Sequence, residues 1–240
     1  MQILLYIVVL LASYLLGSIP FGLIIVGIIA KKDIRKIESG RTGGTNAMRA
    51  AGFWAGCFTA IADFTKSVLA VWLARWVDPS ANWLHVFAPL AAVIGHNYSI
   101  FLVEKLESGR IKLRGGAGGA PTAGGAFGFW PGSLFVIVPF ALLILFGIGY
   151  ASLTTMSIPL IIIIIFSVRA WLGLSPWEYI FYGVFTEIIL IWALRPNIRR
   201  LLNGSERLVG WRARRRNRKL SSNERKPISN QSSSSSSSSS

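Results

Sequence analysis

Long apolar runs dominate this 240-residue chain and restrict the folds open to it. Hydrophobic residues make up 52% of the sequence and charged residues only 15%, against about 25% charged residues in an ordinary soluble domain. A helix needs about 20 mostly apolar residues to cross the hydrocarbon core of a bilayer, and several runs approach or exceed that length. Because a soluble protein could not hide so much apolar surface, the sequence predicts an all-α, polytopic integral membrane protein.

The apolar runs cover residues 3–30, 53–77, 83–103, 123–150, 152–168 and 177–194. The first run contains Gly17-Ser18-Ile19-Pro20, which predicts a kink because proline breaks the helical hydrogen-bond ladder. It lacks a basic leading segment and a clear cleavage site, so we expect a retained span and not a removed signal peptide. The run at 123–150 contains Trp130-Pro131-Gly132 and forms either one span or two.

Lysine and arginine indicate the orientation of these spans. Residues 31–49 hold six of the 25 basic residues, residues 104–114 hold four, and the segment from Arg195 onward holds twelve, whereas the turn at 78–82 holds none. The positive-inside rule places the three basic segments in the cytoplasm. An outer N-terminus and a cytoplasmic C-terminus require an odd number of spans, so the run at 123–150 is predicted to break in two. The expectation is seven transmembrane helices, with a short fourth span.

The net charge of +15 would suggest nucleic acid in a soluble protein. Here the charges lie between and after apolar runs, which favours topology signals and contact with anionic lipid over nucleic-acid binding. We expect one membrane domain at residues 1–210. A basic and then serine-rich tail at 211–240 is predicted to be disordered. The single cysteine, Cys57, excludes an intrachain disulfide and a multi-cysteine metal site.

The first polar loop combines residues that suit phosphate binding. Its sequence is Ile37-Glu38-Ser39-Gly40-Arg41-Thr42-Gly43-Gly44-Thr45-Asn46-Ala47-Met48-Arg49. Glycine frees backbone amides, a following helix presents its N-terminus, and arginine clamps an oxyanion through two hydrogen bonds. An ordinary flexible loop with arginines that set topology is an equally good interpretation.

A second candidate region begins at Gly95-His96-Asn97-Tyr98 and continues into the glycine-rich stretch at 115–125. A histidine within a span is either a general base or a hydrogen-bonded helix contact, although polar residues in spans are usually functional. The glycine-rich stretch is no Walker loop. It either wraps a phosphate or allows close packing of helices.

Three further features are polar groups in or next to apolar runs. Asp63 and Lys66 are spaced i, i+3 in one run, which favours a structural ion pair over a proton relay. Ser152 is either a helix cap or a substrate contact. Residues 197–206, Asn197-Ile198-Arg199-Arg200-Leu201-Leu202-Asn203-Gly204-Ser205-Glu206, form either an interfacial basic helix or part of a site.

Taken together, the order of these motifs resembles the PlsY family of bacterial membrane acyltransferases. The resemblance covers most of residues 12–210 and rests on Gly17 to Gly22, Asp33-Ile34-Arg35, Ser39-Gly40, Gly43 to Asn46 with Arg49, Asp63 with Lys66, Gly95 to Phe101 with Gly115, Gly116 and Gly118, Ser152-Leu153, and Asn197 through Glu206. Each piece is weak alone. Their order, their spacing and their shared side of the membrane make the combination specific.

The resemblance implies a seven-span fold that transfers an acyl group from acyl phosphate to the sn-1 hydroxyl of glycerol 3-phosphate, giving lysophosphatidic acid and phosphate. It further implies a bacterial inner-membrane enzyme in contact with membrane lipid, a site that faces the cytoplasm, and no metal or other cofactor. The sequence leaves the oligomeric state open, and we favour a monomer. The catalytic residues that it implies are Ser39, Arg49, His96, Asn197 and Glu206. The substrate-binding residues are Gly40, Gly43, Thr45, Asn46, Arg114, Gly115, Gly116, Gly118, Thr122 and Ser152. Either a substrate phosphate or His96 would take the proton of the attacking hydroxyl.

The chain departs from the family pattern at three positions. Ala117 stands where the family usually has lysine, Leu194 where it usually has histidine, and Arg41 where asparagine is usual. Arg114, Lys112 or Arg41 would have to supply the missing positive charge.

Two other functions fit part of the sequence. Broken spans and arginine-rich loops also suit a transporter or channel for a small anion. The departures at Ala117 and Leu194 suit an inactive relative that binds lipid or phosphate without turnover.

Overall fold

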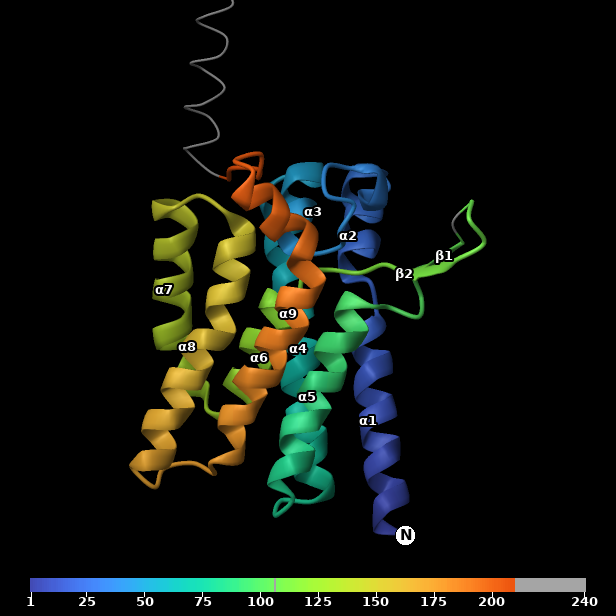
Figure 1. Cartoon of the computed structure of the whole chain (residues 1–240). Coiled ribbons are helices and arrows are strands. Elements are labelled where there is room, and N and C mark those ends of the chain that lie inside the picture. The colour runs from blue at the N-terminus through green and yellow to red at the C-terminus, as the bar shows by residue number, and fades with distance from the viewer. Residues whose placement is uncertain (106, 210–240) are drawn as a thin grey trace, which may run out of the picture.

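A computed structural model describes residues 1–105 and 107–209 as a bundle of helices with one small hairpin (Figure 1). The predicted tail at 211–240 lies outside these described residues. In chain order the elements are α1 Gln2–Ser18, α2 Phe21–Ala30, η1 Ile34–Lys36, α3 Gly44–Ala51, α4 Phe53–Val77, α5 Asn82–Asn97, β1 Val103–Lys105, β2 Ile111–Leu113, α6 Gly119–Phe129, η2 Pro131–Ser133, α7 Leu134–Gly147, α8 Ala151–Trp171 and α9 Glu178–Leu202.

The first apolar run breaks where proline predicted a kink. Helix α1 ends at Ser18 and α2 begins at Phe21, directly after Pro20. The break leaves carbonyl groups at the end of α1 without helical donors. The Lys66 ammonium on α4 donates to two of them, the Gly17 carbonyl at 2.8 Å and the Ile19 carbonyl at 2.9 Å. A buried cation therefore satisfies the broken helix end.

A second break divides the run at 123–150. The sequence predicted this break from the need for an odd number of spans. Helix α6 ends at Phe129, a short 3₁₀ turn covers Pro131–Ser133, and α7 continues to Gly147. The guanidinium of Arg169 on α8 lies 4.1 Å from the Trp130 ring centroid, so a cation–π contact fixes the turn.

The outer surface of the bundle is apolar. In the described part of the chain, residues 2–30, 53–77, 151–171 and 178–202 form helical stretches long and apolar enough to cross a membrane. Large side chains such as Phe135 and Trp171 point outward and are 86% and 85% exposed. The protein is therefore a multi-pass membrane protein whose surface suits lipid.

Aromatic side chains fill the core between α6, α8 and α9. The ring centroids of Phe129 and Tyr179 are 4.3 Å apart, and those of Phe129 and Tyr182 are 5.1 Å apart. Tyr182 is fully buried and donates to the Thr122 carbonyl at 3.1 Å. These contacts hold the start of α6 against α9.

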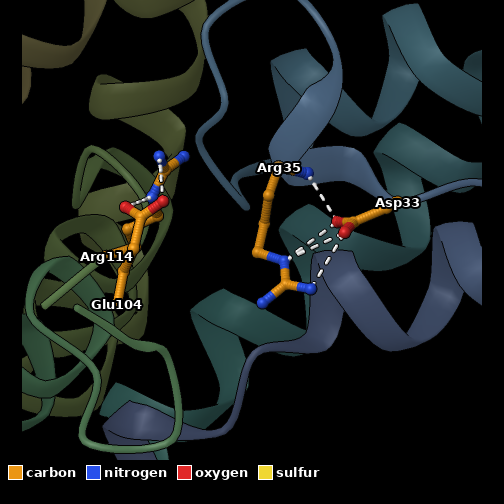
Figure 2. A network of polar contacts seen from close by, with 4 residues as sticks. All are labelled: Asp33, Arg35, Glu104 and Arg114. Carbon is orange, nitrogen blue, oxygen red and sulfur yellow. Dashed lines mark hydrogen bonds and ion pairs between the residues drawn. The ribbon is translucent and has the colours of Figure 1, made fainter. Parts of the chain in front are cut away.

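The prediction that the chain is all-α is wrong for one segment. Helix α5 ends at Asn97 instead of continuing to Val103, and β1 pairs antiparallel with β2 in the register Val103 with Leu113. The apolar residues Ile100, Phe101 and Leu102 continue the hydropathy of α5 although they lie in a turn, so hydropathy alone places the helix end too late. Glu104 and Arg114 form an ion pair across the base of this hairpin (Figure 2).

The last helix is longer than its apolar run. Helix α9 continues to Leu202, eight residues past the predicted end at Leu194, with Pro196 inside it. Proline has no N–H and leaves the Trp192 carbonyl without its helical donor. The Nε of Arg195 donates to that carbonyl at 3.0 Å, so the helix passes through the proline.

Glycines allow α1 and α5 to pack with their backbones in contact. A Cβ on Gly95 would lie 2.2 Å from the Tyr14 carbonyl oxygen, and a Cβ on Gly17 would lie 2.1 Å from the Ala92 carbonyl oxygen. Both distances are far below van der Waals contact, so only glycine permits this approach.

We therefore expect Gly95→Ala to lower the thermal unfolding temperature in detergent, because over-packing costs about 1–3 kcal/mol. Gly27→Ala is the matched control, since Gly27 on α2 has no atom within 4 Å of an added Cβ. Both changes raise helix propensity equally. Equal melting temperatures for the two variants would show that the α1–α5 contact is looser than described.

Candidate active site

A cavity of about 350 Å³ lies between α3, α4, α6, α8 and α9. Loops and helix ends from distant parts of the sequence gather around it. Its lining residues are Ser39, Arg41, Gly43, Gly44, Thr45, Asn46, Met48, Arg49, Phe53, Gly56, Cys57, Ala60, Asp63, His96, Ala117, Gly118, Gly119, Ala120, Ala151, Ser152, Thr155, Leu194, Asn197, Arg200, Glu206 and Arg207. We call it the first cavity.

Three helices begin at the first cavity. The lining includes Gly44 at the start of α3, Gly119 at the start of α6 and Ala151 at the start of α8. The first amides of a helix have no carbonyl partner within it, and the helix dipole makes this end positive. Gly118 supports the start of α6 with φ +90°, a conformation that favours glycine. Three positive helix ends at one cavity are a strong site for an oxyanion.

Glu206 organises one wall of the cavity. It is 5% exposed, and its Oε1 accepts from the Ser152 hydroxyl at 3.2 Å and from Asn197 Nδ2 at 2.9 Å. Its Oε2 accepts from Arg200 Nε at 2.9 Å. These bonds connect the start of α8, the end of α9 and the segment after it. The carboxylate positions a hydroxyl, an amide and a guanidinium around the cavity.

Asn46 holds the first polar loop in place. Its Nδ2 lies within hydrogen-bond distance of the Ile34, Ile37 and Arg41 carbonyls, at 3.2, 3.0 and 2.8 Å. The side chain is 3% exposed, and its Oδ1 has no partner among the described residues. Asn46 therefore shapes the loop that carries Ser39 and Arg41.

Arg41 lies beside Ala117 and Leu194, two of the other positions where the sequence departs from the family pattern. Its Nη1 donates to the Gly116 carbonyl at 2.8 Å, next to Ala117, and its Nη2 donates to the Ala193 carbonyl at 2.6 Å, next to Leu194. Ala117 and Leu194 both line the first cavity. Of the three candidates for the missing charge, Arg41 lines this cavity, whereas Lys112 and Arg114 do not.

Arg49 reaches the cavity from α3 with no carboxylate within 4 Å in the described part of the chain. The nearby Arg207, in contrast, is paired with Glu38 at 3.2 Å. An arginine without a protein counter-ion at an open cavity is ready to bind an anionic ligand.

His96 is fixed by a buried charged cluster. Its Nδ1 lies 3.3 Å from Asp63 Oδ1, and the same oxygen lies 2.9 Å from Lys66 Nζ. All three side chains are at most 5% exposed. On the other side of the ring, a Cβ on Gly116 would lie 1.9 Å from His96 Nε2, so the glycine-rich loop packs directly on the imidazole. Sequence reasoning treated Asp63 and Lys66 only as a pair and missed the contact with His96.

Apolar residues of α4 form another wall. Phe53, Gly56, Cys57 and Ala60 are spaced along one face of that helix and line the cavity. Phe53 is 65% exposed on the outer surface. The cavity therefore joins the three helix N-termini to an apolar surface. Its arginine, amide and hydroxyl donors suit an oxyanion far better than a metal cation.

The structure brings most of the predicted site residues together, but not all of them. Ser39, Arg49, His96, Asn197, Glu206, Gly43, Thr45, Asn46, Gly118 and Ser152 line the first cavity. Gly40, Arg114 and Gly115 line a neighbouring cavity instead, while Gly116 and Thr122 line neither. Thr122 is fully buried in α6. The sequence singled out Arg200 only as part of the stretch 197–206 and did not single out Arg207, whose partner is the distant Glu38.

Comparison with known proteins agrees with this geometry. A family model described as glycerol-3-phosphate acyltransferase matches residues 7–204. The glycerol-3-phosphate acyltransferase of Rubrobacter xylanophilus is 34% identical over 203 residues, which are 85% of this chain and 94% of that protein. The one from Thermus thermophilus is 35% identical over 208 residues, covering 86% and 96% of the two chains.

Solved structures are similar over the same region. The crystal structure of PlsY, an integral membrane glycerol 3-phosphate acyltransferase, in its glycerol 3-phosphate form has a TM-score of 0.72 and 29% identity. It covers 85% of this chain and 96% of that one. The lysophosphatidic acid form of PlsY has a TM-score of 0.67.

The buried cluster predicts a large cost for removing one charge. Asp63→Asn leaves the Lys66 ammonium without its carboxylate, and breaking a buried ion pair costs about 3–5 kcal/mol. We expect a markedly lower unfolding temperature in detergent. Asp33→Asn is the control, because Asp33 pairs with Arg35 at an exposed site where such pairs contribute about 0–1 kcal/mol. Similar melting of both variants would contradict a structural role for Asp63.

Proposed function

This chain belongs to the glycerol-3-phosphate acyltransferase family, and on that premise we propose that it acylates glycerol 3-phosphate in the first cavity with acyl phosphate as donor. The products are lysophosphatidic acid and phosphate. The observation that carries the proposal is the meeting of three helix N-termini with Arg49 and the Glu206 network at one cavity. Both substrates carry phosphate, which this set of donors suits.

The reaction needs orientation more than covalent help. The glycerol hydroxyl oxygen attacks the acyl carbonyl carbon, a new C–O ester bond forms, and the C–O bond to the phosphate breaks. Because the donor is a mixed anhydride, phosphate is a good leaving group. Holding the hydroxyl at the carbonyl supplies much of the rate, and amide and guanidinium donors stabilise the charge on the departing phosphate.

The proton of the attacking hydroxyl has two possible acceptors. A phosphate oxygen of a substrate is one, and His96 is the other. The Asp63 carboxylate beside Nδ1 would stabilise an imidazolium, which suits His96 as a base. Gly116 packs against Nε2, however, so the ring has little freedom to turn. We favour the substrate phosphate as acceptor, with His96 as a positioning group.

We place the donor chain along the apolar face of α4. Phe53, Cys57 and Ala60 line the cavity on that face, and Phe53 is exposed toward the surrounding lipid. An acyl chain that extends from the bilayer would bring its phosphate to the positive helix ends. The soluble glycerol 3-phosphate would then enter from the aqueous side.

The proposal includes the seven-span topology with the N-terminus outside. We count residues 2–30 as one broken span. Six more spans come from α4, α5, α6, α7, α8 and α9. The loop at 31–49 and the described end of α9 lie at one end of the bundle, and the N-terminus lies at the other (Figure 1). The positive-inside rule then puts the site at the cytoplasmic face, in the inner membrane of a bacterium. We further propose that one chain forms the whole site.

A transfer assay tests the reaction. Purified protein in proteoliposomes, supplied with acyl phosphate and labelled glycerol 3-phosphate, is expected to form labelled lysophosphatidic acid, and acyl-CoA in place of acyl phosphate is expected to form none. Arg49→Ala should reduce kcat/KM by about 10–100-fold or more, the value of one or two charge-assisted hydrogen bonds.

The same assay separates the competing functions. Absence of product above the Arg49→Ala background would exclude the transfer reaction. Uptake of glycerol 3-phosphate into the proteoliposomes without product would instead support an anion transporter. Saturable binding without uptake or turnover would support an inactive relative.

A second experiment tests whether Arg41 supplies the charge missing at Ala117. Arg41→Asn is expected to raise KM for a phosphate-bearing substrate about tenfold or more. The double variant Arg41→Asn/Ala117→Lys should recover most of that loss, because the new ammonium would enter the same region. Arg35→Asn, at an exposed ion pair, is the control. Failure of the second change to rescue, with both proteins folded, would leave Arg41 a purely structural role.

A further inference from the structure

A second cavity of about 840 Å³ adjoins the first, and three of the cations that line it, Lys112, Arg195 and Arg199, have no role in the proposed reaction. It lies between the base of the hairpin, the end of α5 and one face of α9. Ser39, Arg41, Asn197, Arg200 and Arg207 line both cavities, so the two share a wall. The second cavity is therefore a neighbour of the reaction site with its own surface.

Positive charge dominates the second cavity. Its basic lining residues are Arg41, Lys112, Arg114, Arg195, Arg199, Arg200 and Arg207, and its acidic lining residue is Glu38. Among the described residues, three of these cations are paired with carboxylates, which leaves four unpaired cations and a net positive charge in a concave space that attracts anions.

Three of these arginines are already neutralised. Arg114 is paired with Glu104, Arg200 with Glu206 at 2.9 Å, and Arg207 with Glu38 at 3.2 Å. Figure 2 shows the Arg114–Glu104 pair together with a second ion pair, in which Arg35 contacts Asp33. The Arg114 guanidinium lowers the pKa of Glu104 below its usual value, so that carboxylate stays ionised at neutral pH.

The other cations have no such partner. Lys112, Arg195 and Arg199 have no carboxylate within 4 Å in the part of the chain that the structure describes. Lys112 comes from the hairpin, while the two arginines are spaced i, i+4 on α9. Like charges at that spacing repel each other and destabilise the helix. A bound anion between them would convert this repulsion into attraction.

Arg195 is held ready for a ligand. Its guanidinium lies 3.2 Å from the Trp192 ring centroid, and its Nε donates to the Trp192 carbonyl freed by Pro196. The Nη atoms are not used by these contacts. Fixing a long side chain in advance lowers the entropic cost of binding. Trp192 itself is 58% exposed, which suits the boundary between lipid and water.

We propose that the second cavity binds a phosphoryl group through Arg195, Arg199 and Lys112, separately from the reaction site. Guanidinium pairs match phosphate oxygens in geometry and charge. The phosphoryl group belongs either to a soluble phosphate or to the head group of an anionic lipid that reaches the cavity beside Trp192. Arg41 lies between the two cavities, with its guanidinium tied to the Gly116 and Ala193 carbonyls.

The test compares two double variants of the full chain. Arg195→Gln/Arg199→Gln removes two cations that line the second cavity. Lys105→Gln/Arg110→Gln is the matched control, because it removes two cations from the hairpin that line neither cavity. Melting temperatures in detergent establish that both variants are folded.

The first experiment titrates each protein with inorganic phosphate and measures binding by calorimetry. In the second, each protein is reconstituted with phosphatidylglycerol or phosphatidylcholine, and native mass spectrometry measures the lipid that stays bound to it. If the ligand is a soluble phosphate, the wild type and the control should each bind phosphate at two sites. The affinity of one site should fall about tenfold or more in Arg195→Gln/Arg199→Gln, and that of the other site should fall in Arg49→Ala. A lipid ligand predicts phosphatidylglycerol retained by the wild type and the control but lost from Arg195→Gln/Arg199→Gln.

Either result supports the proposal and identifies the source of the phosphoryl group. Equal phosphate binding and equal lipid retention in the two double variants would overturn it. Neither arm requires acyl transfer, so this proposal and the proposed reaction fail independently of each other.

Discussion

One buried ammonium connects the membrane fold to its polar site. A lipid-embedded chain must satisfy every backbone polar group internally, and the proline break between α1 and α2 leaves carbonyls that α1 cannot pair. Lys66 donates to two of them and is itself balanced by Asp63, whose carboxylate also touches His96. The break in the first helix, the position of α4 and the orientation of the imidazole therefore depend on the same charge.

In the proposed reaction, the first cavity would attract anions mainly through its backbone geometry, because three helix N-termini meet there. Helix ends are fixed by the fold and need no reorganisation when a charge arrives, whereas long basic side chains must be ordered. Side chains add to this where the fold holds them in advance, as Glu206 holds Arg200 and the carbonyls beside Ala117 and Leu194 hold Arg41. This explains how the chain can lack the usual lysine and histidine while keeping a positive site.

Local patterns predicted much of the fold. Proline and glycine mark the breaks at Pro20 and Pro131 because their effects on the backbone do not depend on distant contacts. Helix α4 has the bounds of its apolar run for the same reason. The hairpin at 103–113 was missed because its strands have three residues each and carry charged side chains, so the sequence there resembles a polar loop. Of the residues around the site, the order of motifs predicted Ser39 and Glu206, but pairings across the bundle, such as Asp63 with His96, leave no local signal.

The segments that surround the first cavity are spread over most of the chain. Ser39 and Arg49 precede α4, His96 ends α5, and Glu206 follows the last helix. During synthesis the loop that carries Ser39 and Arg49 is made long before the carboxylate that organises Ser152, Asn197 and Arg200. The wall that these four residues form cannot exist until α9 is inserted and the chain has turned back over it. Among the described residues, this wall therefore depends on a carboxylate that lies beyond α9, far in sequence from the loop that carries Ser39 and Arg49.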